Sequence, residues 1–148
     1  MTINDRQVEA LHVQLAGRPA EEHLRLFNAL DETDHIGYAA LLAAGLFEAI
    51  QRRFVKDGKV ADRSEVIDFI ATVRARSESS PDEVNPDVAE QIILHALGKG
   101  SLSGIDSSAI TRHQIILLAG LVAQARYNEA ELNAFMRKIC ADAEEMLE

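Results

Sequence analysis

Apolar residues recur along the chain at the three- and four-residue spacing that places them on one face of an α-helix. After Asn4, a suitable N-cap, one such face holds Val8, Leu11, His12 and Leu15, and Gly17 is a suitable end. A second helix is predicted after Pro19, and its apolar face holds Ala20, His23, Leu24, Phe27 and Leu30. The N-terminal part of the chain is therefore expected to be two amphipathic helices.

Two segments are apolar on all sides rather than on one face. The first covers 36–47 within "HIGYAALLAAGLFEAIQRRFVKDG", and the second is "IILLAGLVA" at 115–123. Helices of this kind are normally buried. We therefore predict two central apolar helices, at about 36–55 and 108–126, that lie side by side in the core, with the first ending at Gly58.

Cap residues mark the starts of the remaining helices. Asp62 and Asn128 each have a Glu three residues later, as in a capping box. Asn85-Pro86 is a cap followed by a first-turn proline, and Asp106 or Ser107 caps the second central helix. The apolar stripes behind these caps are Val66, Phe69, Ile70 and Val73; Val88, Ile92, Ile93 and Leu97; and Leu132, Phe135, Met136, Ile139 and Met146 or Leu147.

No strand is predicted, because alternating polar and apolar residues never persist and no Asp-Gly or Asn-Gly hairpin separates β-rich runs. The polar segment "SESSPDEVNPD" predicts a flexible loop at about 77–86. The fold expected is all-α, a single-domain bundle of about seven helices over residues 1–148.

A weak internal repeat is visible at an offset of 66 residues. The capped helix with Val66, Phe69, Ile70 and Val73 corresponds to the one with Leu132, Phe135, Met136 and Ile139, and "LLAAGL" precedes one as "LLAGL" precedes the other. If the repeat is a duplication, Gly45 and Gly120 would let the central helices approach closely. The alternative is that each glycine only makes room for a bulky neighbour.

Composition and charge limit the function. The chain has 148 residues, a formal net charge of −9 and acidic residues in excess in both halves, which opposes binding to nucleic acid or anionic membranes. Its longest apolar stretch is about 12 residues, whereas a membrane-spanning helix needs about 20. One cysteine, Cys140, allows no intrachain disulfide, and the N-terminus lacks a secretory signal pattern. We expect a cytoplasmic protein.

Residues 31–35 read "DETDH" and allow three interpretations. As a helicase acidic box, the string would need a phosphate-binding G-x-x-x-x-G-K-[ST] loop, which the sequence lacks. As metal ligands, the pairs 9/12 and 32/35 have the Glu-x-x-His spacing of di-iron bundles, but the further internal carboxylates are missing. We favour a polar connector in which Thr33 or Asp34 caps a helix that begins near His35.

Three histidines, His12, His23 and His113, fall on or near inward faces and are candidates for ligand binding. Three histidines can hold zinc with one open position, but no two of these share one helix face at i, i+4 spacing. Bonding to a backbone carbonyl is the simpler expectation. We predict no cofactor or metal, and no histidine has a nucleophile or acid placed beside it for catalysis.

The only basic cluster is "QRRFVKDGKVADR", which is a candidate site for an anion or an acidic partner. Complementarity to the dipole at a helix C-terminus already explains its first half. Its cations are Arg52, Arg53, Lys56, Lys59 and Arg63.

Three functions are compatible with these features. The favoured one is a non-catalytic interaction or scaffolding protein, self-associating or bound to another protein, because no catalytic set is found. The alternatives are a ligand- or metal-binding protein with a cavity between the central helices, and an acidic regulator that contacts nucleic acid or an acidic partner through 52–63.

Cys140 is expected to be a small buried side chain rather than a reactive thiol.

Overall fold

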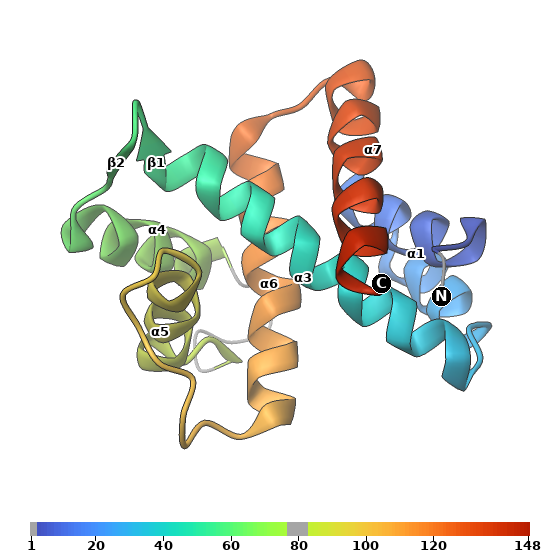
Figure 1. The fold of residues 1–148 in the computed structure, drawn as a ribbon, viewed down its shortest axis with the longest axis horizontal. Coiled ribbons are helices and arrows are strands. Elements are labelled where there is room, and N and C mark those ends of the chain that lie inside the picture. The colour runs from blue at the N-terminus through green and yellow to red at the C-terminus, as the bar shows by residue number, and fades with distance from the viewer. Residues whose placement is uncertain (1–2, 77–82) are drawn as a thin grey trace. The chain divides into compact units, whose positions relative to one another are not determined.

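The computed structural model describes residues 3–76 and 83–148, so the predicted loop at 77–86 lies mostly outside the described residues. The described part is all-α, as predicted, with two very short strands (Figure 1). The elements are α1 (Asp5–Leu15), α2 (Ala20–Asn28), α3 (Glu32–Phe54), β1 (Val55–Lys56), β2 (Lys59–Val60), α4 (Arg63–Arg76), α5 (Pro86–Ala96), α6 (Ser107–Ala125) and α7 (Glu129–Met146).

The chain divides into two compact units. The first consists of Met1–Glu48 and Val122–Glu148, and the second of Ala49–Leu121. The two predicted apolar helices are therefore the elements shared by both units, since α3 and α6 each cross a boundary. That α3 and α6 lie side by side stays a prediction.

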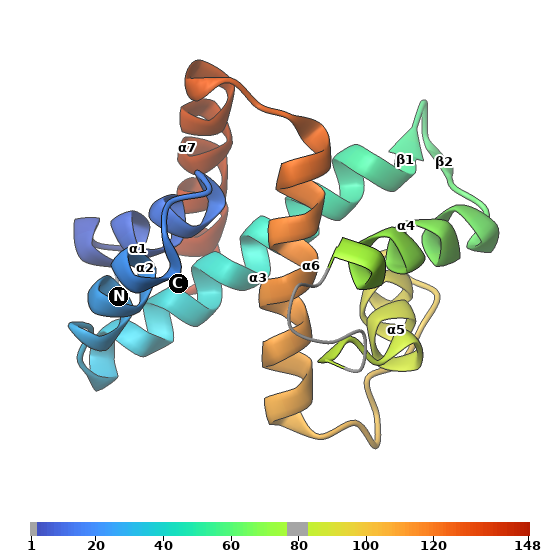
Figure 2. The ribbon, with the colours of Figure 1, turned by 180° about the vertical axis from the view of Figure 1, so that it is seen from behind.

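The first unit contains α1, α2, α7 and most of α3, and α1 contacts both α2 and α7 (Figure 2). The predicted stripe of α7 is buried, except that Met146 is exposed. The face predicted for α1 is wrong in part, because its buried residues are Gln7, Ala10, Leu11 and Val13. The face predicted for the second helix is also wrong in part: Leu24 is 53% exposed and no residue of α2 is buried, although Leu30, just after the helix, is buried.

The second unit contains α4, α5, the hairpin and most of α6. The buried residues of α4 are those predicted, and they match the buried stripe of α7 position by position at the offset of 66. A Cβ added to Gly120 would lie 2.9 Å from Val73 Cγ2 and 3.6 Å from Phe69 Cζ. Gly120 therefore makes room for bulky side chains of α4, as the simpler alternative proposed.

The predicted end of the third helix at about 55 agrees with the structure, but Gly58 is not its stop and the prediction of no strand is wrong. The helix ends at Phe54, and Val55 and Lys56 pair antiparallel with Val60 and Lys59. Asp57 and Gly58 both have positive φ, 54° and 76°, as in a type I′ hairpin turn. The Asp-Gly signal is present in the sequence, but strands of two residues are too short to show an alternating pattern.

Most predicted caps are confirmed. Asn4 caps α1 in a box with Gln7, Asn128 caps α7 in a box with Glu131, and the Asn85 side chain accepts the first N–H groups of α5. The predicted start of α3 near His35, with Thr33 or Asp34 as its cap, is wrong, because the helix already begins at Glu32. Its cap is Asp31, whose Oδ1 accepts the Asp34 N–H at 2.8 Å.

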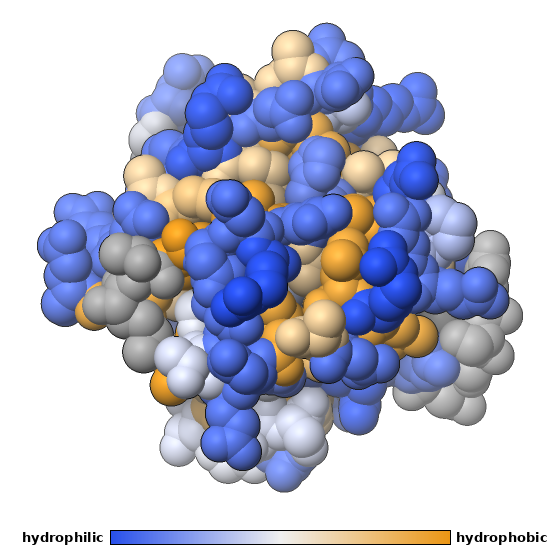
Figure 3. Space-filling view, turned by 90° about the vertical axis from the view of Figure 1, so that its right-hand side faces the viewer, coloured by the Kyte–Doolittle hydropathy of each residue, from blue (hydrophilic) through white to orange (hydrophobic). Residues whose placement is uncertain are grey.

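None of the helices in the described part of the chain combines the length and apolarity required to cross a bilayer. The surface is nevertheless not uniformly polar. On the face drawn in Figure 3, apolar side chains gather in patches between hydrophilic ones.

Candidate functional site

One face of α3 in the first unit is apolar and exposed. Ile36 is 53% exposed and Phe47 is 52% exposed, with Ala39 exposed and Ala43 half-buried between them. These positions are separated by three, four and four residues, so they form one stripe along the helix. The prediction that 36–47 is buried on all sides is therefore wrong on this face, although Leu41, Leu42 and Leu46 on the other faces are buried.

The C-terminal half of α7 borders this stripe. A groove of about 610 Å³ runs between the two helices. It is lined from α3 by Ala43, Ala44, Phe47 and Glu48 and from α7 by Lys138, Asp142, Glu145 and Met146. Met146 is 57% exposed, so a second large apolar side chain faces solvent here. We call Ile36, Ala39, Ala43, Phe47 and Met146 together the α3 surface.

Charged side chains form the rim of the groove, and three of the four are acidic. Lys138 Nζ lies 2.7 Å from Asp142 Oδ2 and 3.8 Å from Glu48 Oε1, so the only lysine in the lining is shared by two acids. Glu145 has no ion-pair partner within residues 3–76 and 83–148. An apolar floor with a charged rim is the usual composition of a protein-binding surface.

The string "DETDH" is not a connector, because α3 already begins at Glu32. Asp34 is only 4% exposed and lies at the third position of α3, where its carboxylate accepts the Asp31 N–H at 3.2 Å. Together with the bond from Asp34 N to Asp31, this makes a reciprocal capping box. The spacing Asp31-x-x-Asp34 was the signal for this cap in the sequence.

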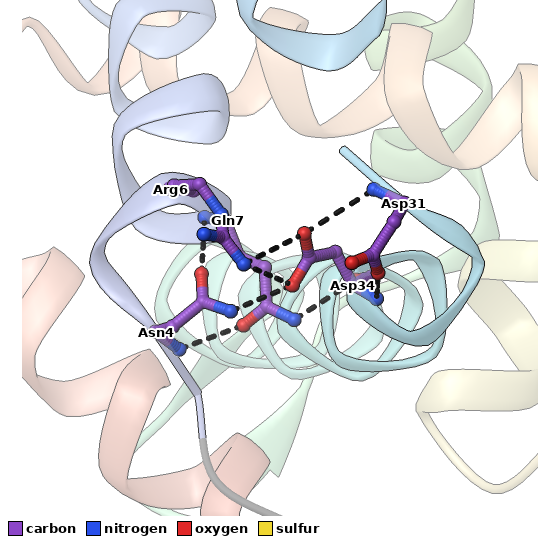
Figure 4. Close-up of polar contacts among 5 residues, drawn as sticks. All are labelled: Asn4, Arg6, Gln7, Asp31 and Asp34. Atoms are coloured by element: carbon purple, nitrogen blue, oxygen red, sulfur yellow. Dashed lines mark hydrogen bonds and ion pairs between the residues drawn. The ribbon is translucent and has the colours of Figure 1, made fainter. Parts of the chain in front are cut away.

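This capping box is joined to the capping box of α1 (Figure 4). Asn4 Nδ2 donates to Asp34 Oδ1 at 2.7 Å, and Arg6 Nη2 lies 3.1 Å from both carboxylate oxygens. Gln7 Nε2 donates to the Asp34 carbonyl at 2.9 Å. The hydrogen bonds from Asn4 and then from Arg6 hold the pKa of Asp34 below its usual value. The acidic string therefore fastens α1 to the start of α3.

Gly37 completes this junction. A Cβ at this position would lie 2.2 Å from Gln7 Nε2, so only glycine leaves room for the Gln7 side chain. Gln7 is itself 2% exposed and bonds Asn4 N through Oε1 at 2.8 Å. The junction is structural, because its buried polar groups are already engaged with one another.

The three candidate histidines are divided between the two units. His12 lines two cavities of the first unit, of about 730 and 660 Å³, and His23 Nδ1 lies 2.9 Å from the Ala10 carbonyl oxygen. His113 belongs to the second unit and is buried. Its Nε2 accepts the Asn85 N–H at 2.9 Å, so Nδ1 carries the proton and donates to the Ala109 carbonyl at 2.7 Å.

No group of three or more His, Cys, Asp or Glu in the described residues is arranged to hold a metal ion. The Cys140 thiol and the Tyr38 hydroxyl, two groups that can act as nucleophiles when ionised, both favour their neutral forms. Burial, and then Glu144, raises the pKa of the Cys140 thiol, while burial raises the pKa of Tyr38 to about 12. Neither group has the lowered pKa of a nucleophile.

The predicted basic cluster is gathered around the hairpin of the second unit. Lys56 and Lys59 are directly opposed in the hairpin register. With Arg53 they line a cavity of about 350 Å³ that also includes Asp62 and Glu65. Arg63 forms an ion pair with Glu90, which raises the pKa of the guanidinium, and Arg52 lies at the end of α3 outside this cavity lining.

Comparison with known proteins gives no relative. No family model matches the chain, and no curated protein or solved structure matches it significantly.

Proposed function

We propose that this chain is a non-catalytic protein-interaction protein whose contact site is the α3 surface. The observation that carries the proposal is the exposure of Ile36 and Phe47 on one helix face, beside the equally exposed Met146. Single exposed apolar residues are common on proteins and need no explanation. A continuous apolar stripe that adjoins a groove is typical of a surface that another helix covers.

Site-specific photo-crosslinking tests this proposal. A photoreactive phenylalanine analogue placed at position 47 should form protein adducts in cells. The same analogue at position 24 should not, since Leu24 is as exposed as Phe47 but lies on α2 outside the stripe. Equal adduct formation at both positions, or none at position 47, would contradict the proposal.

The self-association expected from the sequence stays a prediction. A second copy seated in the groove would bring a rim with three acids against another rim with three acids. Opposed like charges cost free energy at an interface. The charge of the rim therefore favours a partner other than this chain, and we expect that partner to be cytoplasmic because a single cysteine, Cys140, suggests a reducing compartment.

A second candidate function is anion binding at the hairpin. Lys56 and Lys59 face one another in register, an arrangement that is destabilising in a hairpin unless a negative charge lies nearby. With Arg53 in the same cavity lining, the three cations outnumber Asp62 and Glu65. A small phosphorylated compound is the class of ligand that this cavity would fit.

Thermal unfolding with added pyrophosphate tests the hairpin. Pyrophosphate should raise the unfolding temperature of the wild-type chain but not that of Lys56→Gln/Lys59→Gln. Lys99→Gln is the control, because this exposed lysine of the second unit lies outside the cavity lining. An unchanged response in the double variant would remove this candidate.

A further inference from the structure

We infer that the α3 surface binds a basic amphipathic helix of a partner protein. The inference rests on the proposed function and names its partner by shape and charge. Three properties carry it: the length of the exposed stripe on α3, the apolar floor of the adjoining groove and the charge of the groove's rim.

The length of the stripe suits a short helix. Ile36 and Phe47 are eleven residues apart on one helix, which spans about 16 Å at 1.5 Å per residue. A partner helix of three turns covers that distance and presents apolar residues at i, i+3, i+4 and i+7. Between these two large side chains the stripe consists of Ala39 and Ala43. Because alanine side chains are small, the backbone of a partner helix can approach α3 closely there.

The floor offers two anchor points for large apolar side chains. Phe47 and Met146 lie on different helices and both line the groove, while Ala43 and Ala44 form the surface beside them. Methionine adapts its shape to different partners, and a half-exposed phenylalanine gains contact area when it is covered. Leucine, isoleucine or phenylalanine side chains of a partner would fill this space.

The rim decides the charge of the partner. Glu48 and Asp142 share Lys138, and Glu145 is left as a carboxylate beside Met146. The chain as a whole carries −9, so its field also attracts cations. Lysines or arginines that flank the apolar face of the partner would pair with this rim and speed association at low salt.

Peptide binding tests the inference directly. The probe is a labelled amphipathic helical peptide with leucines at i, i+3, i+4 and i+7 and lysines on both flanks. Its control has the same leucines with glutamates in place of the lysines. Fluorescence anisotropy with the full chain should show the lysine peptide binding at least about tenfold more tightly, with an affinity that falls as salt rises.

Matched variants locate the site. Phe47→Gln and Met146→Gln should each weaken binding of the lysine peptide by about tenfold or more. Leu24→Gln and Ile67→Gln remove exposed apolar residues outside the groove and should leave the affinity unchanged. Glu145→Lys should reduce the preference for the lysine peptide. The fold should stay intact in this variant, because Glu145 is exposed.

The outcomes separate this inference from the proposed function. If both peptides bind equally and both lose affinity in Phe47→Gln, the interaction function stands and the basic partner is wrong. If the chain instead dimerises in light scattering and Phe47→Gln abolishes the dimer, the occupant is a second copy. If neither peptide binds and position 47 gives no crosslinked adducts, both proposals fail.

Discussion

Each unit has one buried polar side chain that binds the N-cap asparagine of another helix, but the two junctions use different chemistry. In the first unit the Asp34 carboxylate on α3 binds the Asn4 side chain, and in the second the His113 imidazole on α6 binds the Asn85 N–H. Asp34 also bonds Arg6 and the Asp31 N–H, whereas the other nitrogen of His113 bonds one carbonyl.

The difference reflects the cost of burying each group. A carboxylate loses more hydration free energy than a neutral imidazole, so it needs more donors and a cation to be stable inside the protein. A neutral histidine needs only one donor and one acceptor. The first junction should therefore respond to salt and to protonation of a carboxylate, whereas the second depends on a side chain that can accept the Asn85 N–H.

The largest effect is expected at His113. Replacing it by Leu removes the acceptor of the Asn85 N–H and should lower the free energy of unfolding by about 2–3 kcal/mol. Gln can present an oxygen to the same N–H, so His113→Gln should cost about 1 kcal/mol. Urea denaturation of the two variants measures both values, and equal losses would show that the hydrogen bond is unimportant.

A somewhat smaller effect is expected at Asp34. Asp34→Asn should lower the unfolding temperature at pH 7 by about 3–6 °C, since the amide cannot accept from Arg6 and Asn4 as a carboxylate does. Because folding lowers the pKa of Asp34, its contribution is complete above the ordinary value of 3.8 and is lost as the pH falls through the folded pKa.

The melting curves of wild type and Asp34→Asn should therefore converge below pH 3.8. A constant difference between wild type and Asp34→Asn from pH 7 to pH 2 would mean that the carboxylate charge contributes nothing.

A third prediction concerns the close contact between Gly37 and the Gln7 side chain in the first junction. Gly37→Ala should destabilise the chain by about 1 kcal/mol, because the new Cβ displaces the Gln7 amide from its bonds. In a Gln7→Ala background the same substitution should be neutral or stabilising, since alanine favours the helix by about 1 kcal/mol over glycine. A double-mutant cycle measured by urea denaturation gives the coupling, and additive effects would refute it.

The smallest effect is expected at Arg6. Its side chain is 65% exposed, so Arg6→Gln should lower the unfolding temperature by less than about 2 °C, and high salt should remove most of the difference. Melting scans at low and high NaCl measure this. A loss as large as that of Asp34→Asn would show that the ion pair, rather than the capping bonds, holds the junction.

The sequence was sufficient for features that depend on neighbouring residues. Helix starts at Asn4, Asn85 and Asn128 follow from the chemistry of a cap and the N–H groups next to it, and they occur as predicted. The buried stripes of α4 and α7 also follow from spacing alone, because the remaining positions of these helices are mostly polar.

Only the tertiary structure decided which apolar residues stay exposed and which polar residues are buried. An all-apolar segment such as 36–47 has no polar face to indicate where it meets solvent, so the sequence could not reveal the exposed stripe from Ile36 to Phe47. Asp34 can be buried because Asn4 and Arg6 donate hydrogen bonds to its carboxylate. These two residues lie about thirty positions earlier in the sequence, so no local pattern predicts the contact. Local pattern fixes helices, whereas exposure and buried charge depend on which distant segments meet.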